Sequence, residues 1–169
     1  MIFAFVFSSI TANAAAEIDL MVNGSNATVN GAVWENLVPH TSATGTGTFH
    51  SFLRVQNNGT ERGYNHGLSD AQFDEKTSFT DPMLLSNVPT VEYEGAMYRE
   101  FQLDINENDD NISMDRFQVW LTNTENLLNY NISTYSFGAD ARKVYDTVGF
   151  VLKLAATGGS GKREYRVLI

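Results

Sequence analysis

The chain has 169 residues, 43% of them hydrophobic and 12% aromatic, and its 20 acidic and 11 basic side chains give a net charge of −9. This length suits one domain, and this composition buries enough apolar surface to offset the entropy lost on ordering. Because cysteine is absent, disulfides, zinc ribbons and cysteine nucleophiles are excluded. The acidic balance argues against nucleic acid as a partner, since phosphate binding needs clustered Lys and Arg.

The first residues have the pattern of an export signal. Residues 2–7 form a short apolar run, and residues 12–14 (Ala-Asn-Ala) and 14–16 (Ala-Ala-Ala) offer small-residue cleavage sites. We therefore predict a signal peptide over residues 1–16. A complete signal peptide has Lys or Arg before its apolar run, and none is present here, so we predict that this one is truncated. The alternative is that the segment is an N-terminal core strand. The run is too short to cross a bilayer, which takes about 20 apolar residues, so the mature chain is expected to be secreted without a membrane span.

Apolar and polar residues then alternate over short segments, which is the period of half-buried strands. Turn residues such as Asn30-Gly31 and Glu94-Gly95 separate these segments. The predicted strands cover residues 18–22, 49–56, 90–93, 97–105, 116–121, 130–137 and 148–154. Many short strands without a helical period predict an all-β fold, an antiparallel β-sandwich or jelly roll over residues 17–157. Residues 158–169 start with Gly-Gly-Ser-Gly and are predicted to be a flexible tail.

Residues 45–65 read GTGTFHSFLRVQNNGTERGYN. This run resembles the pattern G-x-G-x-F-x-x-F-x-R-[IV]-Q-x-N-G-T-E-x-G-Y-N of a group of exported bacterial proteins with a C-terminal PEP-CTERM sorting signal, and the likeness extends over residues 45–121. It implies a secreted or surface-sorted β-protein of biofilm-forming Gram-negative bacteria, and no catalytic residue can be carried over from this group. The sorting motif itself is absent, and residues 158–169 break with the preceding composition, as truncation or a shifted reading frame would produce.

An acidic segment over residues 104–115 has part of the spacing of a calcium loop, in which alternating oxygen ligands converge on the ion. The candidate ligands occupy offsets 1, 3, 5, 7 and 12 of such a loop: Asp104, Asn106, Asn108, Asp110 and Asp115. Offset 6 is Asp109 where a calcium loop has glycine, and strands instead of helices are predicted on both sides. The alternative is an acidic hairpin turn, because Asn and Asp favour turns.

A second candidate site lies in the run that carries the resemblance. A sugar-binding loop is predicted from Glu61, Tyr64 and Asn65. The Tyr64 ring would stack on the sugar ring, and the polar groups would form hydrogen bonds with the sugar hydroxyls. Trp120 is a further candidate sugar platform. In the alternative, Glu61 pairs with a neighbouring arginine and both rings pack in the core.

These observations leave three functional hypotheses. The first is an exported, non-catalytic structural protein of the extracellular matrix, with polysaccharide or matrix proteins as partners. The second is a carbohydrate-binding module with a structural calcium, which a coplanar aromatic strip including Tyr64, Tyr98 or Trp120 on one sheet face would favour. The third is a glycan-active hydrolase, which needs two carboxylates facing each other across a cleft. No H-E-x-x-H or G-x-S-x-G motif occurs, so a non-catalytic protein is expected.

Overall fold

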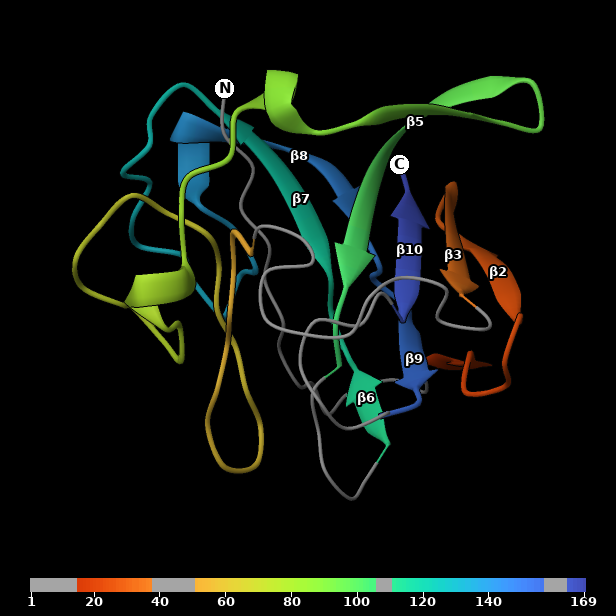
Figure 1. Cartoon of the computed structure of the whole chain (residues 1–169). Coiled ribbons are helices and arrows are strands. Elements are labelled where there is room, and N and C mark those ends of the chain that lie inside the picture. Colours follow the sequence, from red (N-terminus) through yellow and green to blue (C-terminus); the bar gives the residue numbers. More distant parts are fainter. Residues whose placement is uncertain (1–14, 38–50, 106–110, 157–163) are drawn as a thin grey trace. The chain divides into compact units, whose positions relative to one another are not determined.

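The computed structural model describes residues 15–37, 51–105, 111–156 and 164–169, which divide into two compact units (Figure 1). Described residues 51–87 and 115–148 form the first unit, and the remaining ones form the second. Within the described ranges the helices are single 3-10 turns: η1 (Thr77–Phe79), η2 (Leu85–Asn87) and η3 (Gly138–Asp140). The predicted all-β fold is confirmed, and its largely antiparallel sheets are consistent with a β-sandwich.

The second unit contains a five-stranded antiparallel sheet in the order β2-β3-β10-β5-β4. These strands are β2 (Asn26–Val29), β3 (Ala32–Asn36), β4 (Thr90–Tyr93), β5 (Ala96–Leu103) and β10 (Tyr165–Leu168). Two-residue turns join β2 to β3 and β4 to β5, and all four turn residues have positive φ: Asn30 48°, Gly31 89°, Glu94 49° and Gly95 81°. Paired positive φ values mark type I′ turns, whose twist matches that of the strands they join.

A three-stranded sheet in the same unit has the order β1-β9-β6, with β1 (Ala16–Asp19), β9 (Phe150–Leu154) and β6 (Ile112–Met114). Its β1–β9 pair is parallel, unlike the other pairs of named strands in the described chain. The hydroxyl of Tyr165 in β10 ties the two sheets together. It accepts the backbone N–H of Ala155 at 2.7 Å and donates to the carbonyl of Leu20 at 3.1 Å.

The C-terminal residues differ from their prediction as a flexible tail. Residues 157–163 lie outside the described part, but Tyr165–Leu168 form β10, which pairs with β3 on one side and β5 on the other (Figure 1). Val167 lies between Trp34 and Phe101 on these neighbours, and Val167 and Trp34 are fully buried. A four-residue strand carries too little pattern to be recognised alone, and pairing on both sides makes it central to the sheet.

The first unit contains one pair of strands, β7 (Gln118–Thr122) and β8 (Ala141–Asp146), which are antiparallel with a bulge between Val119 and Trp120. Long irregular segments surround the pair. A cluster of buried rings and one leucine packs beneath these segments: Tyr64, Trp120, Leu127, Tyr130 and Phe137. The rings meet mainly edge to face, as with Tyr64 and Phe137 at 4.9 Å between centroids, which is the arrangement that aromatic quadrupoles favour.

Two predicted strands of this unit are wrong. The described part of residues 49–56 makes only an isolated bridge between Val55 and Glu75. Residues 130–137 form a tight turn instead, closed by a bridge between Asn131 and Ser136. The Asn131 Oδ1 atom accepts the N–H groups of Ser133 and Thr134, so a local side-chain bond outcompetes strand pairing in this segment.

In the part of the chain that the structure describes, no helix is both long and apolar enough to cross a membrane.

Candidate functional site

The structure places two of the five predicted calcium ligands. Asp104 follows β5 and Asp115 follows β6, and both are partly buried. Asn106, Asn108 and Asp110 lie outside the described residues. Within the described ranges, no group of three or more His, Cys, Asp or Glu side chains is placed to hold a metal ion. Calcium binding stays a prediction from the sequence.

The predicted sugar-binding loop is placed, and most of it is buried. Tyr64 has an exposed fraction of 0%, Asn65 of 2% and Trp120 of 4%. A ring that stacks on a sugar must show one face to solvent, so burial contradicts Tyr64 and Trp120 as platforms. Glu61 is partly exposed, and its Oε1 accepts the backbone N–H of Asn57.

The loop carrying Tyr64 is held in place by the buried carboxylate of Glu75. The two oxygens of Glu75 accept the backbone N–H groups of Tyr64 at 3.0 Å and Phe73 at 2.7 Å. Gly63 allows this close approach, because a Cβ at this position would lie 2.5 Å from Cγ1 of Val55. Tyr64, which the sequence analysis marked for sugar binding, is therefore part of the core that this loop covers.

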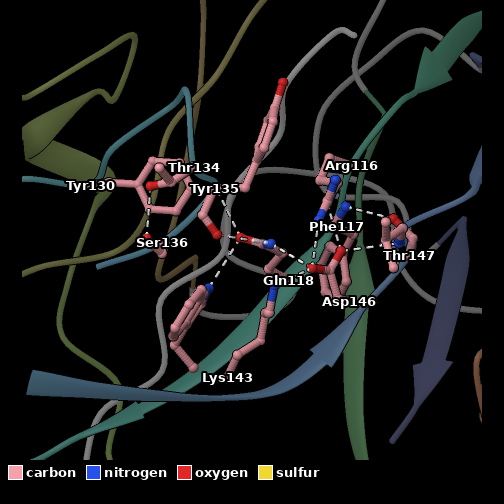
Figure 2. A network of polar contacts seen from close by, with 12 residues as sticks. Arg116, Phe117, Gln118, Tyr130, Thr134, Tyr135, Ser136, Lys143, Asp146 and Thr147 are labelled. Atoms are coloured by element: carbon pink, nitrogen blue, oxygen red, sulfur yellow. Dashed lines mark hydrogen bonds and ion pairs between the residues drawn. The ribbon is translucent and has the colours of Figure 1, made fainter. Parts of the chain in front are cut away.

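A buried polar network connects the two strands of the first unit (Figure 2). Asp146, the last residue of β8, accepts Arg116 Nη2 at 2.7 Å, Gln118 Nε2 at 2.7 Å and Lys143 Nζ at 2.6 Å, all on Oδ2. Burial alone raises the pKa of Asp146, but the hydrogen bonds from Arg116, Lys143 and Gln118 outweigh it and leave the pKa below its ordinary value. The carboxylate is therefore held ionised and fully partnered.

Gln118 extends the network into the aromatic cluster. Its Oε1 accepts the Trp120 indole N–H at 3.1 Å and the Tyr130 hydroxyl at 2.8 Å. Burial raises the pKa of Tyr130, so this hydroxyl stays protonated and able to donate. These hydrogen bonds join the strand pair to the aromatic cluster, so the network fixes the core of the first unit. Nothing in the local sequence marks Gln118 or Asp146 beyond the alternation of a strand.

The described residues do not form the coplanar aromatic strip that would favour a carbohydrate-binding module, since Tyr64 and Trp120 are buried. Tyr98 of β5 is partly exposed and meets Tyr93 of β4 with 6.2 Å between ring centroids and 82° between ring planes. The guanidinium of Arg166 lies 5.5 Å from the centroid of Tyr93, over one face of that ring. Perpendicular rings do not present one flat surface to a polysaccharide chain.

The first unit has an open hollow of about 600 Å³ beside the end of β7. Its polar lining residues come from the last residue of β7, the segment after it and η3: Thr122, Asn123, Thr124, Asn126, Asn129 and Asp140. Leu127, Leu128 and Ala139 contribute apolar surface. An adjoining hollow of about 260 Å³ shares part of this lining and adds Arg142. Sequence reasoning missed this site, although its signal is a run rich in Asn and Thr.

Comparison of the chain with protein-family models, with curated proteins and with solved structures finds no match.

Proposed function

We propose that this chain is an exported, non-catalytic structural protein associated with an extracellular matrix. The observation that supports this most directly is the use of its buried charges. The carboxylates of Glu75 and Asp146 and the guanidinium of Arg116 all hold loops and strands of the first unit together. A catalytic acid or base needs a titratable group that reaches a substrate, whereas these groups are committed to the protein's own backbone and side chains.

The export part of the proposal rests on the apolar run and small residues of the N-terminal segment and on the PEP-CTERM-like resemblance. Few lysines and a net charge of −9 suit a soluble protein outside the cell. Strands are the longest regular elements among the described residues, and this architecture by itself says nothing about chemistry.

The experiment is expression of the full chain in a Gram-negative host, followed by fractionation and N-terminal sequencing of the product. We expect processed protein outside the cytoplasm, cleaved after Ala14 or Ala16. The matched control is Val6→Asp, which interrupts the apolar run and should leave unprocessed protein in the cytoplasm. Cytoplasmic, unprocessed wild-type chain would contradict export. Co-sedimentation of the exported chain with the host's extracellular matrix then tests the association.

A second candidate function is carbohydrate binding. The observation that favours it is the hollow beside β7, whose lining combines amides, hydroxyls and a carboxylate with apolar side chains. Binding sites for small ligands combine apolar surface with a few polar groups in this way.

A further inference from the structure

We infer that the hollow beside β7 binds a neutral carbohydrate chain through Asn123, Asn126 and Asp140. The inference rests on the second candidate function and assigns a site to it. Within the described chain, no hydrogen bond uses the side-chain polar groups of Asn123, Asn126, Asn129 or Asp140, and all four residues are exposed.

This distinguishes them from asparagines that shape loops elsewhere in the first unit. The side chain of Asn57 donates to Asp74 at 2.7 Å, and that of Asn131 closes its own turn. Around the hollow, the turns are closed by threonines instead. Thr122 Oγ1 accepts the N–H of Thr124, and Thr124 Oγ1 accepts the N–H of Asn126, both at 3.2 Å. The asparagines therefore line the hollow with side chains that make no hydrogen bond within the described chain.

The segment that carries these amides has a fixed base. Leu127 is buried in the aromatic cluster, and the carbonyl of Glu125 accepts the N–H of Gly67 at 2.9 Å. The side chain of Gln72 bonds both backbone groups of Tyr130, at 3.1 Å to the N–H and 2.9 Å to the carbonyl. A ligand on this surface orders little additional backbone, and such preorganisation raises affinity.

The lining chemistry selects the ligand class. Each amide provides both donors and an acceptor, which matches the alternating needs of neighbouring sugar hydroxyls. Leu128 is 43% exposed and gives the hollow an apolar contact for the C–H face of a sugar ring. No described residue lining the larger hollow is Lys or Arg, and Asp140 adds a negative charge, so sulfated or uronic-acid polymers are disfavoured.

The test is affinity electrophoresis of the full chain through native gels containing a soluble β-glucan, galactomannan or dextran, with alginate as the anionic comparison. We expect a neutral polymer to retard the wild type. The triple variant Asn123→Ala, Asn126→Ala and Asp140→Ala should weaken the retardation at least about tenfold. Each lost hydrogen bond makes a modest contribution to the binding free energy, and the three contributions add. Asn129 is left intact, because its φ of 63° favours asparagine.

The matched control is Asn58→Ala, Asn87→Ala and Asp70→Ala, which removes the same groups from exposed positions outside the hollow. It should bind as the wild type does, and thermal melts confirm that both triple variants fold. The single change Asn126→Ala is a milder second test, with a smaller loss of retardation expected.

If the wild type binds and the hollow variant binds equally, the assigned site is wrong while carbohydrate binding stands. If no neutral polymer retards the wild type, or only alginate does, the site and the second candidate function both fail.

Discussion

The Nε atom of Arg116 lies 2.6 Å from Oδ1 of Asp146, and both side chains are about nine-tenths buried. The guanidinium also lies over the ring of Tyr135, 4.7 Å from its centroid. Taking two charges out of water costs free energy. The pair is tolerated because Gln118 and Lys143 also donate hydrogen bonds to the carboxylate of Asp146. The pair therefore connects the segment just before β7 to the last residue of β8.

Replacing Asp146 by Asn is expected to destabilise the first unit by about 3–5 kcal/mol, because the change leaves a buried Arg116 without its counter-charge. Urea unfolding at pH 7 measures the loss. The control is Glu17→Gln, which removes a largely exposed partner 3.5 Å from Lys153 and should cost under about 1 kcal/mol. Equal effects of the two substitutions would contradict the importance assigned to the buried pair.

The same carboxylate predicts a pH dependence. The pKa of Asp146 is lower in the folded chain than its ordinary value of 3.8, so the ionised form stabilises the fold. This contribution is complete above the unfolded pKa and is lost as the pH falls through the folded pKa. The wild type should therefore lose stability relative to Asp146→Asn below about pH 4. Urea midpoints of both chains from pH 7 to pH 3 measure this, and a constant difference would refute it.

His66 predicts an acid effect at a higher pH. The residue is 1% exposed, and its Nδ1 accepts the N–H of Leu68 at 3.1 Å, so the ring is neutral with its proton on Nε2. Burial lowers the pKa of His66, although the nearby Glu75 opposes the shift. The unfolded chain then takes up the proton more readily, so stability falls as the pH drops below about 6.5.

The comparison variant for this effect is His66→Asn, whose side-chain oxygen can still accept from Leu68 but does not titrate. Denaturation midpoints are measured from pH 7.5 to pH 5.5. Wild type should lose stability across this interval relative to the variant. Parallel curves would show that His66 does not titrate on unfolding as proposed.

Tyr165→Phe removes the hydroxyl that ties the two sheets of the second unit together. The N–H of Ala155 would lose its acceptor, whereas the carbonyl of Leu20 keeps a second donor, Nδ2 of Asn36 at 2.8 Å; leaving one partly buried group unsatisfied costs about 1–3 kcal/mol. Tyr98→Phe is the matched control, because that tyrosine is partly exposed, and it should be nearly neutral. Chemical denaturation distinguishes the two, and a neutral Tyr165→Phe would contradict the linking role.

The acidic segment over residues 104–115 predicts stabilisation by calcium. An ion that binds only the folded chain raises the melting temperature by mass action, so millimolar Ca²⁺ should raise it and EDTA should reverse the rise. Asp110→Ala should abolish the response. An equal melting temperature with and without Ca²⁺ would contradict calcium binding and favour the alternative, an acidic hairpin turn.

Part of this structure follows from local pattern. The Asn30-Gly31 dipeptide marks a tight turn in the sequence, and it joins β2 to β3 with the positive φ values that Asn and Gly tolerate. The alternation over residues 97–105 likewise gives β5 nearly to its ends. Both signals act within a few residues, so no distant partner is needed to recognise them.

Long-range pairing decided the rest. The alternation at β7 predicts one apolar face, yet Gln118 and Trp120 on its other face are buried too, because the segment over residues 127–137 packs rings against them. The all-β class and the two-residue turns can be predicted from the sequence, since strand period and turn conformation are properties of neighbouring residues. The central place of β10, the burial of Tyr64 and the position of Asn126 in the lining of a hollow could not be predicted, because they depend on residues far apart along the chain.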